Sequence, residues 1–268
     1  MKRYRWLLGC CLFLSIGMLW AADEPDLRML QQKAAQSRDM EGYVGVCKYL
    51  YQTEENPELL LLYADSIHQL ATKSKKPEQL VEYYIWASEG NFIKGDFQQG
   101  YALKRKAIAL AEKAGLKFAI SQSCCDMGYY CNVDARYDSA RYYFRKGLEA
   151  GEDLSEAGEA CRTMLTNYAS SFLFEGKTDS ALVYTIRASE RSAADKDTAM
   201  LIENLNQLGT IYRRKKDLEN CITNFEQALH LCELRGNHNA VAFIYGNIAT
   251  AYCDWNRPGD AIPFSEKA

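Results

Sequence analysis

Proline is scarce in this sequence, and its distribution bounds the possible secondary structure. Only five prolines occur in 268 residues, and none lies between Glu78 and Arg257. A proline fixes its own φ angle and lacks a backbone N–H donor, so it interrupts helices. Its absence means that nothing in this long interval prevents the chain from being helical almost throughout.

The sequence also has few of the residues that catalysis or metal binding requires. It contains three histidines, His68, His230 and His238, and each is isolated from other candidate ligands. An enzyme needs a nucleophile, a base or metal ligands that converge on one point. The phosphate-binding loop, the dinucleotide-binding glycine loop and the nucleophile elbow are all absent from the sequence. We therefore predict that the chain is not an enzyme and binds no cofactor and no metal.

The sequence also has no excess of basic residues over acidic ones. The chain has 32 basic and 35 acidic residues. Without the first 22 residues, which hold three basic residues and no acidic ones, 29 basic and 35 acidic residues remain, a net charge of about −6. A protein that binds nucleic acid needs a basic stripe to displace the counterions of the phosphates. We therefore predict that this segment binds no nucleic acid.

The first 22 residues have the composition of an export signal. Three basic residues at positions 2–5 precede an apolar run over residues 6–20, and Ala21 and Ala22 follow it. This order of charge, apolar residues and small residues is typical of a secretory signal peptide. The apolar run is shorter than the roughly 20 residues of a membrane-spanning helix, which favours cleavage over retention as an inner-membrane anchor. In both cases we expect export, to the periplasm of a Gram-negative bacterium.

Eight cysteines lie beyond this segment. An exported protein can form disulfides, but a chain of this length does not need them, and no CxxC pair suggests a zinc site. Several of the cysteines occupy positions of the repeat described below that need a small or apolar residue. We therefore expect most of them to be buried thiols. They are Cys47, Cys124, Cys125, Cys131, Cys161, Cys221, Cys232 and Cys253.

A unit of about 40 residues recurs along the chain. Its clearest copy has large apolar residues and a glycine on a first helix, then small and aromatic residues on a second: Leu205, Leu208, Gly209, Tyr212, Cys221, Phe225 and Ala228. The scheme recurs upstream from Met127 and from Leu165, and downstream from Tyr245. Two divergent copies begin near Glu41 and Val81. Spacings of three and four residues between the apolar positions are those of one helical face. The pattern predicts six helical hairpins.

Small residues indicate how the helices of one hairpin pack. On the first helix of the four regular copies they are Gly128, Ala169, Gly209 and Ala249, and on the second helix Ala140, Ala181, Cys221 and Ala261. Small residues on facing surfaces let two helices lie close together, and large residues fill the remaining space. Since one hairpin cannot bury its apolar surface alone, the copies are expected to stack.

This pattern resembles that of the tetratricopeptide repeat (TPR) family. The long period is similar to that of repeats in bacterial regulatory proteins, where such arrays serve as input modules. The resemblance covers about residues 42–268 and implies an all-α fold, a right-handed α-solenoid of stacked antiparallel helix hairpins. We expect a capping helix over residues 25–37 and divergent repeats within residues 23–120. Regular repeats are expected over residues 121–268, with the last one cut off by the end of the chain.

The resemblance also implies where a partner binds. In TPR arrays the first helices line a concave groove, and residues offset from the packing positions face it. Such side chains can hold a protein or peptide through hydrogen bonds. Carried onto this sequence, they are Tyr129, Asn132, Thr166, Ser170, Asn206, Thr210, Arg213, Arg214 and Thr250. The clamp that chaperone-binding members use for a C-terminal carboxylate is not reproduced, because the matching positions hold Cys125, Thr166, Asn206 and Gly246.

Two hypotheses of function remain at this point. The first is the periplasmic sensory input region of a signal-transduction or transcription-regulatory protein, because the last unit ends at Ala268 without a polar capping helix. The second is a stand-alone envelope scaffold or assembly factor with no signalling output. Both need a protein or peptide partner, and both contact a membrane only through the N-terminal segment or a region beyond Ala268.

Overall fold

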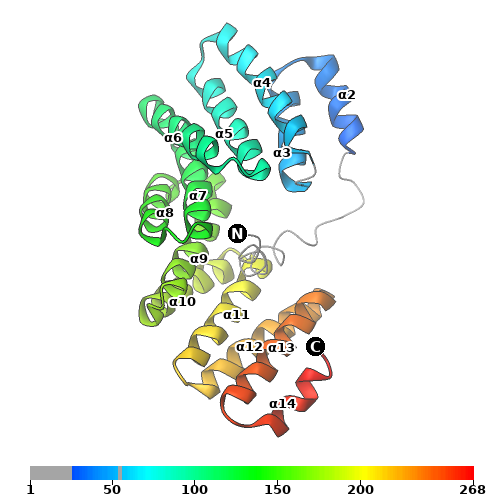
Figure 1. The fold of residues 1–268 in the computed structure, drawn as a ribbon, viewed down its shortest axis with the longest axis vertical. Coiled ribbons are helices and arrows are strands. Elements are labelled where there is room, and N and C mark those ends of the chain that lie inside the picture. The colour runs from blue at the N-terminus through cyan, green and yellow to red at the C-terminus, as the bar shows by residue number, and fades with distance from the viewer. Residues whose placement is uncertain (1–25, 54–55) are drawn as a thin grey trace. The chain divides into compact units, whose positions relative to one another are not determined.

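The computed structural model describes residues 26–53 and 56–268, and the expected export signal lies outside them. These residues form helices and turns, without a strand among them (Figure 1). The helices are α2 (Leu27–Ser37), α3 (Met40–Thr53), α4 (Pro57–Ser74), α5 (Pro77–Lys94), α6 (Phe97–Ala114), α7 (Lys117–Val133), α8 (Tyr137–Gly151), η1 (Ser155–Ala157), α9 (Gly158–Phe174), α10 (Thr178–Ala194), α11 (Thr198–Arg214), α12 (Leu218–Leu234), α13 (His238–Asp254) and α14 (Pro258–Ser265). The predicted all-α class is confirmed.

Three turns between successive helices of the C-terminal part share one local structure. Asp197, Asp217 and Asn237 each precede a helix and accept a hydrogen bond from the backbone N–H three residues later, at 3.0–3.1 Å. Such N-caps satisfy backbone donors that the first helical turn leaves without partners. The residue before each cap has a positive φ, for example 66° at Gly236. These turns reverse the chain and set α10, α11, α12 and α13 side by side.

The chain divides into two compact units. The N-terminal unit contains residues 26–53, 56–127 and 145–160, and the C-terminal unit contains residues 128–144 and 161–268. Within each unit, helices that follow one another along the chain pack together, as α4 does with α5 and α11 with α12. First helices of successive hairpins also touch, α3 with α5 and α11 with α13. The hairpins therefore stack, as the repeat pattern predicts.

The small residues lie where the pattern places them. A Cβ atom added to Gly209 would lie 2.6 Å from the ring of Phe225, and one added to Gly128 would lie 2.3 Å from the ring of Phe144. Both rings are fully buried. Ala140, Ala181, Cys221 and Ala261 on the second helices are buried as well. Glycine is thus required on the first helix because the aromatic ring of the second helix occupies the position of a side chain.

The N-terminal unit has its own core. Buried residues of α3, α4, α5 and α6 form one apolar cluster around Ile67, Val81, Trp86 and Leu103. Helix α2 packs on α3 through Ala34, Val46 and Leu50 in a second cluster. Helix α2 lies within residues 25–37, the range in which a capping helix is expected. The predicted boundary near residue 120 is not tested by this structure and stays a prediction.

Lys104 is fully buried in this unit. Its ammonium group forms ion pairs with Glu89 of α5 and, at 2.9 Å, with Asp126 of α7. Burial alone would lower the pKa of Lys104, but the carboxylates of Asp126 and Glu89 raise it above its ordinary value. Three helices thus meet at one buried cation, a contact that the repeat pattern does not predict.

Seven of the eight cysteines are buried, as the sequence predicts, whereas Cys253 is exposed. His238 is the first residue of α13. No helix in the described part of the chain combines the length and the apolar character that crossing a membrane requires.

Candidate binding surface of the first helices

The nine residues predicted for partner binding all lie on first helices of the C-terminal unit. Tyr129 and Asn132 belong to the C-terminal part of α7, Thr166 and Ser170 to α9, and Thr250 to α13. The remaining four, Asn206, Thr210, Arg213 and Arg214, are on α11. We call the surface formed by α9, α11, α13 and residues 128–133 the first-helix surface.

Side-chain amides connect neighbouring helices of this surface. Nδ2 of Asn247 donates to Oδ1 of Asn206 at 2.8 Å, which joins α13 to α11. Nε2 of Gln207 donates to Oγ of Ser170 at 2.6 Å, which joins α11 to α9. Nδ2 of Asn132 donates to the backbone oxygen of Asn167 at 3.0 Å. The surface is therefore polar and internally hydrogen-bonded.

Three of the nine predicted residues are buried. Asn132, Thr166 and Ser170 are 3%, 1% and 6% exposed. Thr166 Oγ1 donates to Oδ1 of Asn204 at 2.9 Å, and Ser170 accepts from Gln207. In the described conformation these three side chains bond to the next first helix, Asn132 to α9 and the other two to α11, and they do not face solvent. A direct role of Thr166 or Ser170 in binding stays a prediction and requires the contact between α9 and α11 to open.

The other predicted residues are at least partly accessible. Asn206 and Thr210 are partly buried, and Arg214 and Thr250 are exposed. Nε of Arg213 lies 3.6 Å from Oδ2 of Asp254. Nη1 of Arg214 donates to the backbone oxygen of Leu173 at 2.8 Å. A guanidinium carries five N–H donors, so each arginine keeps further donors for an acceptor on a ligand.

The amide pair leaves hydrogen-bonding capacity on the surface. Among the described residues, neither Nδ2 of Asn206 nor Oδ1 of Asn247 has a hydrogen-bond partner. One donor and one acceptor therefore lie close together at partly buried positions. A peptide group presents the complementary acceptor and donor, so the pair can hold an extended backbone.

Sequence reasoning missed four polar residues of this region. They are Glu203, Asn204 and Gln207 of α11 and Asn247 of α13. Asn204 and Gln207 are three residues apart on one helical face, which is the signal that identifies them as a pair. Burial, with a smaller contribution from Asp197, raises the pKa of Glu203 to about 8. Burial thus favours the neutral form of this carboxyl group.

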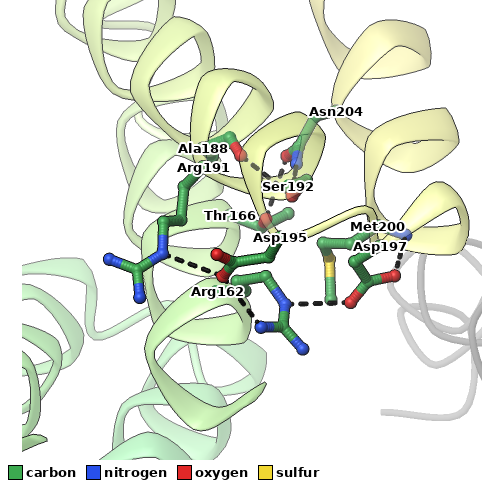
Figure 2. Close-up of polar contacts among 9 residues, drawn as sticks. All are labelled: Arg162, Thr166, Ala188, Arg191, Ser192, Asp195, Asp197, Met200 and Asn204. Carbon is green, nitrogen blue, oxygen red and sulfur yellow. Dashed lines mark hydrogen bonds and ion pairs between the residues drawn. The ribbon is translucent and has the colours of Figure 1, made fainter. Parts of the chain in front are cut away.

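A second group of contacts lies where α10 leads into α11 (Figure 2). Arg162 of α9 pairs with Asp195 at 3.0 Å and with Asp197 at 2.9 Å, and Arg191 pairs with Asp195 at 2.8 Å. Hydrogen bonds to Arg191 and Arg162 lower the pKa of Asp195. The turn is thus fixed to α9 by charged groups at the surface.

Within residues 26–53 and 56–268, no group of three or more His, Cys, Asp and Glu residues is placed to hold a metal ion. Burial also raises the pKa of several thiols, that of Cys124 to about 12 and those of Cys221 and Cys232 to about 11. Such thiols are poor nucleophiles at neutral pH. The chemistry that the described residues offer is hydrogen bonding and charge pairing on the first-helix surface.

Residues 200–268 match the family model described as Tetratricopeptide repeat. No curated protein matches the chain in sequence. The solved structure of BtubC (BKLC) from P. vanneervenii is 16% identical, with a TM-score of 0.65 over 82% of this chain and 89% of that chain. The apo form of RapI is 10% identical, with a TM-score of 0.71 over 99% of this chain and 74% of that chain.

A further similar structure is NprR in complex with its cognate peptide NprX. It is 15% identical, with a TM-score of 0.52 over 89% of this chain and 69% of that chain. Identities this low show a shared fold. Together with the match of residues 200–268 to the tetratricopeptide repeat model, they show that this chain has a TPR-like repeat fold.

Proposed function

We propose that this protein binds a peptide, or an extended segment of another protein, on the first-helix surface of the C-terminal unit. The observation that carries the proposal is the Asn206–Asn247 amide pair, whose remaining donor and acceptor are partly accessible. Arg213 and Arg214 both lie about two helical turns further along α11, and they add positive charge for an acidic group on the ligand. The similar structure of NprR contains a bound cognate peptide, which supports the class of ligand.

The test is selection from a library of short peptides, followed by affinity measurement on three forms of the protein. We expect the double variant Asn206→Ala, Arg213→Ala to bind the selected peptides at least tenfold more weakly. A hydrogen bond to a charged group typically contributes about 1.5–3 kcal/mol to binding. The matched control is Gln227→Ala plus Arg235→Ala, two exposed residues at α12. Equal weakening in both variants, with unchanged melting temperatures, would place the binding surface elsewhere.

For the cellular role, we propose an exported sensory input region in a signalling or regulatory protein. The support is the basic, apolar and small-residue order of residues 2–22, and the similarity in fold to RapI and NprR. The stand-alone scaffold remains the second candidate, because the first-helix surface serves it equally well. A fusion of residues 1–30 to alkaline phosphatase tests export, since that enzyme is active only outside the cytoplasm. An inactive but stable fusion would contradict export and leave the binding proposal intact.

A further inference from the structure

The α9–α10 hairpin lacks the aromatic core residue of its neighbours. Phe144 and Phe225 occupy corresponding positions of the preceding and following second helices, and each is fully buried beside a glycine of the first helix. The corresponding residue of α10 is Thr185, also fully buried. Its hydroxyl lies 3.0 Å from Oε1 of Gln207. At this position a hydroxyl bonded to an amide of α11 therefore replaces the phenylalanine of the adjacent hairpins.

Two amides of α11 each bridge α9 and α10. Asn204 accepts from Thr166 of α9 at 2.9 Å and donates to Ser192 of α10 at 3.1 Å (Figure 2). Gln207 donates to Ser170 of α9 and accepts from Thr185 of α10. All six side chains are buried. We call this set the polar joint; its members are Thr166, Ser170, Thr185, Ser192, Asn204 and Gln207.

The next contact along the stack is apolar at three of the six corresponding positions, and it keeps polar residues, Asn206, Thr210 and Asn247, at the others. The residue of α13 that corresponds to Asn204 is Ile244, and the residue of α12 that corresponds to Ser192 is Cys232. Both are fully buried within one apolar cluster. Separating α13 from α12 would expose that cluster to water. Separating α11 from the α9–α10 hairpin would instead expose groups that water can hydrogen-bond, so the free-energy cost is smaller.

The character of this contact changes along α11. At the N-terminal end of the helix, Arg162 holds Asp195 and Asp197 by ion pairs that solvent reaches (Figure 2). The polar joint follows. At the C-terminal end, Ile211 packs with Leu173 and Ala181 in an apolar cluster, and Arg214 bonds the backbone of α9. The N-terminal end is therefore the end that separates most readily.

The α9–α10 hairpin can move as one body. Tyr184 of α10 packs edge-on against Tyr168 of α9 with ring centroids 4.6 Å apart, and it stacks on Phe172 of α9 at 5.3 Å. These contacts lie within the hairpin and do not involve α11. We propose that the polar joint is a built-in hinge. It opens at the N-terminal end of α11, pivots on the Leu173–Ala181–Ile211 cluster, and changes the spacing of α9 and α11 on the first-helix surface.

The first test is hydrogen exchange of the full chain, analysed by peptide fragments and without any ligand. We expect the amides of residues 195–207 to exchange about tenfold faster than those of residues 240–252 on α13, the matched helix behind the apolar contact. Residues 208–214 should exchange more slowly than residues 195–207. Uniform exchange along α11, or equal exchange in α11 and α13, would overturn the hinge.

The second test replaces three members of the polar joint by less polar residues, two of them the residues found at the corresponding positions of α12 and α13. In Thr166→Val, Ser192→Cys, Asn204→Ile, the exchange of residues 195–207 should slow by about tenfold, because opening now exposes apolar groups. Fragments of α13 and α14 report in the same spectra whether the variant is folded. Unchanged or faster exchange at residues 195–207 in a folded variant contradicts the proposal.

If the triple variant does not fold, a single substitution tests the same proposal. Arg162→Met removes the ion pairs at the N-terminal end and should speed exchange at residues 195–207 while residues 208–214 stay unchanged. Its control is Arg257→Met, which breaks an ion pair to Asp260 that lies within one turn and joins no hairpins. An equal effect of both variants, or faster exchange along the whole of α11, would exclude opening at this end.

Discussion

At the scale of single residues, the contact between Gly209 and Phe225 sets how closely α11 and α12 approach. The glycine has no room for a side chain, because a Cβ atom would lie 2.6 Å from the ring of a fully buried phenylalanine. Gly128 and Phe144 have the same relation. The small residues that the sequence pattern marks are thus the partners of specific aromatic rings.

Replacing Gly209 by leucine should destabilise the protein by about 1–3 kcal/mol, because overpacking pushes the two helices apart. Urea denaturation followed by circular dichroism measures the change. The control is Gly246→Ala on α13, where the nearest atom to an added Cβ is 3.9 Å away. That change should be neutral or stabilising, since alanine favours a helix by roughly 0.5–1 kcal/mol over glycine. Equal stability of Gly209→Leu and the wild type would show that the contact does not limit helix packing.

At the scale of helices, Lys104 joins α5, α6 and α7 of the N-terminal unit through its ion pairs with Glu89 and Asp126. Replacing it by methionine should destabilise the protein by about 3–5 kcal/mol at neutral pH, because two carboxylates lose their buried cation. Arg105→Met, at an exposed position of the same helix, is the control and should be close to neutral. Denaturant unfolding of both variants measures the difference.

The same substitution has a pH dependence with a defined sign. In the variant the carboxylates of Glu89 and Asp126 no longer have the Lys104 cation beside them, and burying their charge is costly. Protonation of these carboxylates at low pH removes that cost. The difference in free energy of unfolding between Lys104→Met and the wild type should therefore become smaller as pH falls towards 4. If this difference stays constant from pH 4 to 7, the carboxylates are not the cause of the lost stability.

At the scale of the whole molecule, the cysteines report on packing in both units. Cys47 and Cys124 lie in the N-terminal unit, and Cys221 and Cys232 in the C-terminal one, all buried with raised thiol pKa values. Cys253 is the exposed one among the eight described cysteines. In a form with Cys10 and Cys11 replaced by serine, a thiol reagent should label one cysteine quickly in native protein and all eight after unfolding without reductant.

In that experiment, Cys253→Ser should abolish the fast reaction and leave seven thiols after unfolding. Three or four disulfides, seen as fewer than four free thiols after unfolding, would contradict the expectation that these cysteines are reduced. Rapid labelling of several cysteines in the native protein would instead show that the cores open readily. The first outcome would contradict the expected reduced state of the cysteines, and the second would contradict the described packing.

The repeat pattern predicts most of the fold, because its signals come from residues that are close together in the sequence. The signals are apolar residues spaced three and four apart, glycines that face aromatic rings, and capping residues before several helices. Each acts over a short stretch of chain, so it is visible in the sequence. The candidate surface could be predicted as a set of positions on first helices. The solvent exposure of each residue could not, because Asn132, Thr166 and Ser170 are buried and bond to residues of other helices.

The sequence by itself determined the all-α class, the stacking of hairpins and the close approach at Gly209, because each follows from residue size and periodicity. Only the tertiary structure decided which polar residues meet. Asn204 and Gln207 lie more than 30 residues from Thr166 and Ser170, and Glu89, Lys104 and Asp126 come from three helices. Such pairings depend on the rotation and offset of neighbouring helices. A polar side chain in the sequence has the same identity whether the packing leaves it in water or buries it against a partner.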